Sequence, residues 1–373
     1  MIRLGILVLA EPNNGVFQYT LSMLEAVRYL EGWNVTLYST PENHHYDGEG
    51  YPVRRIRADR KNWPSLVVRD LLNLGMPDPF EGEDILLAPY HSPILLHTRK
   101  PFYYTLHDLQ EQYFPENFSW PRRVWRGLIN SRLAKRAARV ICESEYVRRD
   151  IVRVLGMPPD RVTVIAAPPV TMPASACSAA LVESTRAKYQ LPDRYLFYPA
   201  QFWAHKNHLR LLDAFSQVVT AFPDVHLVLT GRRCYEYRRI LTRVSDLGLE
   251  KRVRHIGPVD QSDLGVLYRC ALALVMPSLF ESVSLPVYEA FQCGTPVCAS
   301  NVVAIPEQVG GAGLLFDPYS VDSIVESMSR MLESDELRQR LAILGRARFE
   351  AMTHEAYAKQ LAALLTSSDG SMP

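Results

Sequence analysis

The chain has 373 residues, of which 47% are hydrophobic and 22% are charged, with a formal net charge of +1. This length predicts two domains that each bury a core, and the small net charge gives no electrostatic reason to expect a nucleic-acid partner. No apolar run approaches the roughly 20 residues that span a bilayer, and the six cysteines show no metal-like spacing, which favours a reducing, cytoplasmic compartment.

The first half of the chain alternates predicted strands and helices. Residues 2–10 form an apolar run typical of a buried strand, residues 16–30 have helical apolar spacing, and residues 33–39 form a second predicted strand. This β-α-β opening implies a parallel sheet. Further strands are predicted at 85–89, 102–105, 139–144 and 162–167, with a helix at 145–155.

Two loops of this half are expected at the edge of the sheet where ligands bind, which in an α/β sheet is the carboxyl end of the strands. Gly15 ends the Asn-Asn-Gly loop at 13–15, where a glycine lets the backbone approach a phosphate. A plain tight turn explains this loop equally well. His107 follows the strand at 102–105, and a structural histidine held by Asp108 is its alternative interpretation.

A basic segment covers residues 120–139. It contains seven arginines and lysines with interleaved tryptophans and no acidic residue. The spacing is helical, with Val124, Leu128 and Leu133 available for an apolar face. Such a helix can lie on an anionic membrane surface, whereas the solvated face of an ordinary domain helix is the competing interpretation.

Residues 168–180 are rich in Pro, Ala and Ser and show no periodicity, which predicts a linker at 171–190. The expected fold class is α/β, with two doubly wound parallel sheets in domains 1–170 and 191–350, and a C-terminal helix and tail at 351–373 that pack back toward the first domain. Strands of the second domain are predicted at 195–199, 225–230, 253–256, 271–275, 296–299 and 313–316, and helices at 209–222, 235–247, 263–268 and within 321–365.

The stretch 276–294 concentrates the candidate chemistry. Ser284 is suited to a helix N-cap, Pro286 is accepted in a first helical turn, and the helix is expected to end near Gly294. A helix N-terminus offers unpaired amides and a positive dipole end to a phosphate. The loop amides beside it are those of Ser282, Val283, Ser284 and Leu285.

Two glutamates, Glu281 and Glu289, flank this helix start with seven residues between them. Their carboxylates are good acceptors for sugar hydroxyls. For the pair alone, a surface position of Glu281 and a helix-dipole role of Glu289 explain the spacing as well.

Two other loops of the second half follow predicted strands. Lys206, in the loop 200–207, is a point charge where a strand ends and a helix begins, which suits a phosphate. A solvated surface lysine is the alternative. Gly257, Pro258 and Val259 follow another strand, where backbone groups can meet the edge of a base.

Together these motifs resemble a retaining glycosyltransferase of the GT-B fold, similar to glycosyltransferase family four, the group 1 glycosyl transferases. The resemblance spans nearly the whole chain, and its C-terminal motifs are the more specific ones. The matching segments are FESVSLPVYEAFQCGTPV at 280–297, AIPE at 304–307, GAGLLFDP at 311–318, HKN at 205–207, HIGPV at 255–259, TLHDL at 105–109 and CESEYVRRD at 142–150.

The resemblance implies a role for each candidate residue. Lys206 would hold the donor pyrophosphate, Glu289 would bind the ribose, and Glu281 would contact the transferred sugar. His107 would lie at the transferred sugar and the reaction centre, which makes His107, Glu281 and Lys206 the catalytic set. The implied donor-binding set is Gly15, His205, Lys206, Asn207, Gly257, Pro258, Val259, Ser282, Val283, Ser284, Leu285 and Glu289.

Within that set, Gly15 would approach the phosphates, the amides of 283–285 would bind a phosphate, and the loop 257–259 would lie beside the base. Such enzymes are thought to attack from the front face, so that the leaving phosphate helps to deprotonate the acceptor. They need no metal, and the chain contains no Asp-x-Asp. The adjacent His44 and His45 are expected to be solvated rather than metal-bound.

The chain departs from the family pattern at two places. Ser282 and Ser284 stand where glycines are usual, which narrows the allowed backbone conformations. The basic residue that often stands a few positions before Lys206 is missing, since residues 201–205 offer only His205. Arg210 is a candidate substitute, although it lies in the following helix.

The expected function is transfer of a sugar from a UDP- or GDP-sugar to a glycan or lipid-linked acceptor in surface polysaccharide or glycoconjugate synthesis. Segment 120–139 would hold the cytoplasmic enzyme at the inner face of the membrane. The alternative is a catalytically degenerate nucleotide-sugar-binding module, motivated by Ser282 and Ser284. An epimerase would need more acidic groups, and a phosphorylase a longer chain and a cofactor lysine.

Overall fold

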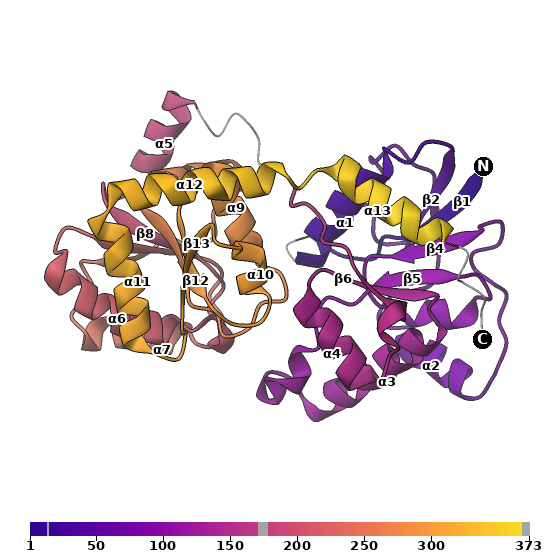
Figure 1. Ribbon diagram of the computed structural model, residues 1–373. Helices are drawn as coiled ribbons and strands as arrows, with labels where there is room; N and C mark the ends of the chain where they lie inside the picture. The colour runs from indigo at the N-terminus through magenta and orange to yellow at the C-terminus, as the bar shows by residue number, and fades with distance from the viewer. Residues whose placement is uncertain (13–14, 171–177, 368–373) are drawn as a thin grey trace. The chain divides into compact units, whose positions relative to one another are not determined.

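The structure is a computed structural model that describes residues 1–12, 15–170 and 178–367. Two compact units divide the chain. Unit 1 comprises Met1–Val170 and Met352–Pro373, and unit 2 comprises Thr171–Ala351. Each unit has its own parallel sheet (Figure 1) and is described by itself. The α/β class with two doubly wound sheets is therefore confirmed.

In the described part of unit 1, the sheet has seven strands in the order β3-β2-β1-β4-β5-β6-β7, and every neighbouring pair is parallel. The order reverses between β1 and β4, which places the ligand crevice of this sheet at the carboxyl ends of those strands. The strands are β1 (Ile2–Leu7), β2 (Trp33–Ser39), β3 (Val53–Arg55), β4 (Ile85–Ala88), β5 (Phe102–Thr105), β6 (Arg139–Cys142) and β7 (Val162–Val164).

Helices cover both faces of this sheet because successive strand residues point to opposite sides. On β4, Leu86 packs with the cluster that holds α2, α3 and α4, whereas Leu87 packs with α1 and α13. The helices are α1 (Gly15–Val27), α2 (Trp63–Leu71), α3 (Trp120–Arg136), α4 (Glu145–Leu155) and α13 (His354–Thr366), with short 3-10 turns η1 (Pro93–His97), η2 (Gln110–Gln112), η3 (Pro115–Asn117) and η4 (Pro159–Arg161).

In the described part of unit 2, a parallel sheet of six strands has the order β10-β9-β8-β11-β12-β13, with its switch point between β8 and β11. The strands are β8 (Tyr195–Pro199), β9 (His226–Thr230), β10 (Val253–His255), β11 (Ala273–Met276), β12 (Val297–Ser300) and β13 (Gly313–Phe316). The first strand of the unit thus lies in the middle of its sheet, as in other doubly wound folds.

Eight helices of unit 2 are described, and α12 packs directly on α9. A Cβ at Gly345 of α12 would lie 2.4 Å from the Phe291 ring of α9, so this approach requires glycine. The helices are α5 (Ala179–Tyr189), α6 (His208–Ala221), α7 (Tyr237–Asp246), α8 (Gln261–Cys270), α9 (Leu285–Cys293), α10 (Ile305–Val309), α11 (Val321–Glu333) and α12 (Asp335–Glu350), with the turn η6 (Ala204–Lys206) before α6.

Most predicted elements are found, and three differences stand out. The sequence prediction omits β3 and α2. Helix α5 occupies most of the predicted linker 171–190, of which 171–177 lie outside the described residues. The helix of the basic segment ends at Arg136, short of the predicted segment end at 139, whereas β6 begins at Arg139 as predicted. Of the predicted phosphate loop at 13–15, the structure describes Gly15 alone.

Helix α3 carries the predicted basic segment, but its apolar stripe faces the core of unit 1. Leu133 is fully buried and Leu128 packs against the same cluster, whereas Val124 is exposed. Arg126 pairs with Asp108 and Glu111. The apolar face proposed for membrane contact is therefore wrong at Leu128 and Leu133. Among the described residues, no helix combines the length and the apolar character that a membrane span requires.

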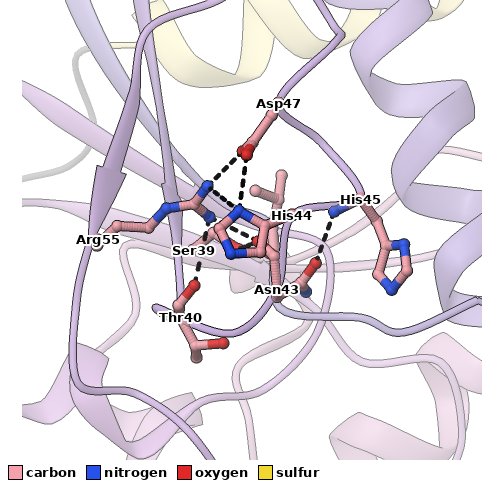
Figure 2. A network of polar contacts seen from close by, with 8 residues as sticks. Ser39, Thr40, Asn43, His44, His45, Asp47 and Arg55 are labelled. Atoms are coloured by element: carbon pink, nitrogen blue, oxygen red, sulfur yellow. Dashed lines mark hydrogen bonds and ion pairs between the residues drawn. The ribbon is translucent and has the colours of Figure 1, made fainter.

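The loop after β2 is tied to β3 by polar contacts (Figure 2). Arg55 donates from Nη1 to the Asn43 carbonyl at 2.5 Å and from Nη2 to Asp47 Oδ1 at 2.5 Å. His44 is exposed, and its Nδ1 lies 2.9 Å from Asp47 Oδ2. These bonds explain how a strand of three residues is held at the sheet edge. Within the described chain, no cluster of His, Cys, Asp or Glu is arranged to hold a metal.

Candidate active site

A lysine and a glutamate meet at the switch point of the unit 2 sheet. Lys206 ends the turn η6 after β8, and Glu281 lies in the loop between β11 and α9. Lys206 Nζ donates to Glu281 Oε1 at 2.5 Å, and their side chains are 20% and 13% exposed. Because β8 and β11 are neighbours, two residues 75 positions apart in sequence form one ion pair at the ligand edge.

The loop that carries Lys206 is fastened to the neighbouring loops by backbone carbonyls. Buried Asn207 has φ 60°, a left-handed conformation that asparagine tolerates. Its Nδ2 donates to the carbonyls of Pro277 and Pro318 at 3.0 and 2.9 Å. The amide of Leu279 donates to the His205 carbonyl at 2.7 Å. His205 and Asn207 therefore position Lys206, through the backbone and a side-chain amide respectively.

The serines that replace the family glycines are accommodated without strain. Ser284 is the N-cap of α9 with φ −104° and ψ 103°, an extended conformation open to any residue. Ser282 is likewise absent from the described non-glycine residues with positive φ. The backbone of this loop therefore does not require glycine at position 282 or 284.

A buried glutamine clamps the same loop. The Ser284 amide donates to Gln308 Oε1 at 2.9 Å, and Gln308 Nε2 donates to the Ser284 carbonyl at 2.6 Å. The Ser284 amide is therefore committed within the chain, and the prediction that it binds a phosphate requires this bond to break. The amides of Val283 and Leu285 remain predicted phosphate donors beside the N-terminus of α9.

Replacing Gln308 with alanine is expected to lower the free energy of unfolding by about 1–3 kcal/mol, because two buried backbone groups lose their partners. Urea unfolding followed by circular dichroism measures this change. Gln339→Ala is the matched control, since Gln339 is exposed on α12, where substitutions usually change stability by less than about 0.5 kcal/mol. Equal stabilities of the two variants would contradict the clamp.

Glu289 lies on α9 with its carboxylate held by a tyrosine from α8. The hydroxyl of fully buried Tyr268 donates to Glu289 Oε2 at 2.6 Å. Burial raises the pKa of Glu289, and the bond from Tyr268 opposes that rise. A carboxylate can accept several hydrogen bonds, so a fixed Glu289 retains acceptor capacity for the two hydroxyls of a ribose.

The loop 257–259 contacts the loop after β9 through two glycines, Gly257 and Gly231. Gly257 has φ +78°, and its carbonyl accepts from the Gly231 amide at 3.1 Å. A Cβ on Gly231 would lie 2.4 Å from the Ala200 carbonyl oxygen. The Gly231 carbonyl lies 3.1 Å from His255 Nε2. The loops after β8, β9 and β10 therefore converge, and Pro258 and Val259 continue from this point.

Arg210, in the helix that follows Lys206, is bonded to the loop that carries the lysine. Its Nη1 donates to Asn207 Oδ1 at 2.9 Å and to the Pro318 carbonyl at 3.2 Å. Gln201, five positions before Lys206, accepts from the Trp203 indole at 2.9 Å. Arg210 therefore supports the loop, and Lys206 is the cation that the structure places against Glu281.

In unit 1, His107 follows β5 and is held on both ring nitrogens. Nδ1 lies 2.8 Å from Glu143 Oε2, and Nε2 lies 2.8 Å from the Pro89 carbonyl. The carbonyl can only accept, so Nε2 carries a proton. Burial lowers the pKa of His107, but the bond and charge of Glu143 and the Pro89 carbonyl outweigh it, and the net pKa is raised. The ring is therefore held toward its cationic form.

Tyr19 packs against this histidine and is itself held by a second tyrosine. The Tyr19 ring meets the His107 ring edge to face, with centroids 4.8 Å apart. The Tyr19 hydroxyl lies 2.9 Å from Thr105 Oγ1 and 3.0 Å from the hydroxyl of Tyr357 on α13. The C-terminal helix thus supports the ligand edge of unit 1. Gly15 begins α1, and a Cβ there would meet nothing within 4 Å.

The predicted residues fall into two sets, Gly15 and His107 in unit 1 and the others in unit 2. Sequence reasoning missed the partners that fix them. Glu143 was the easiest of these to find, because it follows β6, the strand beside β5. The partners without a local signal are Tyr268, Gln308, Tyr19 and Tyr357.

The chain has two doubly wound parallel units, and one of them places a lysine beside a helix N-terminus at its switch point. This architecture is that of the GT-B class of glycosyltransferase. Family models agree. The model of the group 1 glycosyl transferases matches residues 182–348, and that of glycosyltransferase family 4 matches residues 13–168. The chain belongs to glycosyltransferase family 4.

Curated relatives and solved structures are consistent with this family. O-antigen chain mannosyltransferase B of Escherichia coli is 30% identical over 281 residues, covering 71% of each chain. O-antigen chain mannosyltransferase RfbU of Salmonella typhimurium is 22% identical, covering 83% of this chain and 85% of that relative. Sucrose-phosphate synthase from Thermosynechococcus elongatus superposes with a TM-score of 0.76 at 22% identity over 98% of each chain. Anabaena HepE, solved with UDP-glucose, gives a TM-score of 0.77 at 18% identity, covering 98% of this chain and 100% of that one.

Proposed function

We propose that this glycosyltransferase moves a mannosyl group from a nucleoside diphosphate mannose to a glycan or lipid-linked acceptor, with retention of configuration. The mannosyl group and the polysaccharide context are supported by the O-antigen mannosyltransferases that the chain resembles. The nucleotide donor is supported by the UDP-glucose bound to a structural neighbour of the same fold.

The observation that carries this proposal is the ion pair between Lys206 and Glu281 at the switch point of unit 2. In the free protein each side chain neutralises the other. A donor diphosphate would take the Lys206 ammonium as its counterion, and the N-terminus of α9 adds a second positive end. Glu281 would then be released to accept hydrogen bonds from the hydroxyls of the sugar.

This arrangement suits a reaction in which charge develops on the leaving diphosphate. The bond between the anomeric carbon and the diphosphate oxygen breaks, and the acceptor oxygen bonds to the same face of that carbon. The acceptor proton passes to the leaving phosphate. Lys206 and the amides of Val283 and Leu285 stabilise the departing charge, so the reaction is proposed to need no divalent metal.

Two further residues are proposed to take part, one in each unit. Glu289, fixed by Tyr268, accepts from the ribose hydroxyls of the nucleotide. His107, which lies in unit 1 and is held toward its cationic form by Glu143, is proposed from the family resemblance to act on the transferred sugar. Since Nε2 donates to the Pro89 carbonyl, its hydrogen bonds position the ring rather than carry a proton to the substrate.

The test is transfer from GDP-mannose and UDP-mannose to a mannose-terminated oligosaccharide acceptor. We expect one of the two donors to give product whose new linkage has the anomeric configuration of the donor, as read by NMR coupling of the anomeric carbon and proton. Activity is expected to persist in EDTA. An inverted product, or nucleotide release in neither reaction, would contradict the proposal.

The alternative function, a degenerate sugar-nucleotide-binding module, was motivated by the two serines of the loop before α9. The backbone conformation of Ser284 is one that any residue can adopt, so this serine gives no reason to expect a distorted loop. Lys206 follows β8, whereas Glu281 and Glu289 follow β11, the neighbouring strand of the same sheet.

A further inference from the structure

Helices α6 and α7 of unit 2 pack on each other (Figure 1) and border a cavity of about 490 Å³. Sites for small molecules have volumes of about 300–1,000 Å³. Seven of the eight residues that line this cavity are polar or charged, which favours a polar ligand. Lys206, Glu281 and Glu289 are not among the eight, so the cavity is distinct from the proposed donor site. We call it the α6–α7 cavity.

Three arginines from two helices line the α6–α7 cavity. Arg210 comes from α6, whereas Arg239 and Arg243 come from α7. Arg243 Nε donates to Asp213 Oδ1 at 2.6 Å, which joins the two helices across the cavity wall. Arg239 lies 3.2 Å from Glu236 at the start of its own helix and is 71% exposed. Such an exposed pair is weak, so the guanidinium of Arg239 can exchange this contact for a ligand.

Arg210 has no carboxylate partner in the part of the chain that the structure describes. Its Nη1 donates to Asn207 Oδ1 at 2.9 Å and to the Pro318 carbonyl at 3.2 Å, and its guanidinium lies 5.7 Å from the centre of the Tyr319 ring. All three partners are neutral, so the charge of Arg210 lacks a counterion. A guanidinium has five N–H donors in a planar fork. These bonds use Nη1 alone, which leaves Nε and Nη2 for an anion.

One face of α7 supplies both donors and acceptors to the cavity. Arg239, Thr242, Arg243 and Asp246 all line it, and their i, i+3, i+4, i+7 spacing is that of one helix face. Guanidinium forks bind phosphate oxygens, whereas hydroxyls and carboxylates bind sugar hydroxyls. None of the eight lining residues is aromatic, so the cavity offers no ring on which a nucleobase would stack. This chemistry matches a sugar phosphate better than a nucleotide.

We propose that the α6–α7 cavity binds a sugar phosphate and that this ligand acts on the proposed donor site through Arg210. The phosphate would lie on the guanidinium groups of Arg210 and Arg239, and the sugar hydroxyls would bond to Thr242 and Asp246. Free inorganic phosphate shares the first set of contacts but lacks the second, so the two ligands can be told apart by affinity.

The α6–α7 cavity and the proposed donor site share one loop. Asn207 lines the cavity and directly follows Lys206. Its Nδ2 donates to the carbonyls of Pro277 and Pro318, and its Oδ1 accepts from Arg210. A phosphate on Nε and Nη2 of Arg210 would hold the guanidinium against Asn207 and so fix the loop of Lys206. The sugar phosphate is therefore expected to raise the affinity for the nucleoside diphosphate, and linkage requires the reverse effect to be equal.

This regulation rests on the proposed function, in which Lys206 binds the donor diphosphate, whereas the binding of the sugar phosphate does not. A nucleoside diphosphate sugar is made from a sugar 1-phosphate by nucleotidyl transfer. A cavity for a sugar phosphate would therefore let the enzyme respond to the supply of the precursor of its own donor.

The experiment is calorimetric titration of the full chain, saturated with UDP or GDP, with mannose 1-phosphate and with inorganic phosphate. The nucleotide keeps the sugar phosphate out of the donor site. We expect one mannose 1-phosphate to bind per chain, more tightly than inorganic phosphate. In the reverse titration, mannose 1-phosphate should raise the affinity for the nucleotide by about fivefold or more. A lowered nucleotide affinity would mean that both compete for the donor site, and would overturn the proposal.

Arg239→Gln is expected to weaken the binding of mannose 1-phosphate by about tenfold, because a charge-assisted contact to the phosphate is lost. The matched control is Arg238→Gln, which removes the same charge from the preceding residue, exposed on α7 and absent from the cavity lining. The control should bind as the wild type does. Equal affinities of the two variants, or of mannose 1-phosphate and inorganic phosphate for the wild type, contradict the assigned site.

A transfer assay separates the regulation from the reaction. Mannose 1-phosphate should lower the KM for the donor in the wild type and in Arg238→Gln but not in Arg239→Gln, and both variants should keep wild-type transfer without it. An unchanged KM with the sugar phosphate bound would refute the coupling through Arg210. If neither nucleotide binds and no donor is used, the proposed function fails, and titration of the two nucleotide-free variants still decides the cavity.

Discussion

Replacing Lys206 with methionine is expected to reduce kcat for sugar transfer by about 1,000-fold, the upper end of the effect of removing one preorganised electrostatic group. The same change should weaken binding of the free nucleoside diphosphate, because the diphosphate loses its counterion. Methionine keeps much of the length of the lysine side chain. Calorimetric titration with UDP and GDP measures the affinity, and a transfer assay measures kcat.

Glu281→Gln is expected to act differently on the affinity for the nucleoside diphosphate and on kcat for transfer. In the free protein Glu281 holds the Lys206 ammonium at 2.5 Å, so the donor diphosphate must displace it. Without the carboxylate charge, the nucleoside diphosphate should bind as tightly as before or more tightly. Transfer should still fall by about 100-fold or more, because the sugar loses an ionised acceptor that positions it.

Stability has to be followed in both variants, because removing one member of a mostly buried ion pair costs about 3 kcal/mol. The double variant Lys206→Met with Glu281→Gln leaves neither charge unpaired and tests whether inactivity reflects unfolding. Lys251→Met is the control, since Lys251 is exposed elsewhere on unit 2. Wild-type transfer in the Lys206 variant, or lost nucleotide binding in the Glu281 variant alone, would contradict the assigned roles.

The fold follows from the sequence where the apolar pattern is strong. Strand β8 and helix α4 have the predicted bounds, because each is a regular run with clear ends. Strand β3 was missed since two of its three residues are arginines, and it depends on the contacts of Arg55 with the preceding loop. Helix α2 was missed for a different reason: it has nine residues, fewer than the window of about 11 to 18 residues in which helical spacing is recognised.

The site was predictable wherever topology alone decides position. Lys206 and Glu281 each follow a strand, and the β/α alternation sends all such loops to one edge of the sheet. The contacts that tune the site depend on packing between distant segments. Gln308 reaches Ser284 across 24 residues, and nothing in the AIPEQV sequence indicates that its amide faces a backbone. The conformation of Ser284 likewise could not be deduced from the family glycine that it replaces.

Replacing Glu143 with glutamine is expected to invert the pH dependence that His107 gives to stability. In the wild type the folded pKa of His107 is raised above its ordinary value of 6.5. The contribution of His107 to the free energy of unfolding is therefore complete below about pH 6.5 and is lost as the pH rises through the folded pKa. Without the Glu143 carboxylate, burial dominates, the folded pKa of His107 falls below 6.5, and protonation at acid pH favours the unfolded chain.

The difference in unfolding free energy between the wild type and Glu143→Gln should thus grow as the pH falls from about 9 to about 6. Urea unfolding across this range measures it, and NMR titration of the His107 ring reports the pKa directly. Glu145→Gln is the control, because Glu145 is exposed and pairs with Arg148 on its own helix. A constant difference across the range would mean that His107 is not held as a cation.

The same substitution separates two roles of His107 in transfer. If the imidazolium charge serves the reaction centre, the variant with a neutral His107 at pH 7.5 should lose about 100-fold in kcat and regain part of it at acid pH, where the ring is protonated again. If the ring acts only through its shape, kcat should follow the wild-type pH profile. Since Nε2 is tied to the Pro89 carbonyl in either case, we expect the first outcome: charge is what the Glu143 contact adds to a ring already held in place.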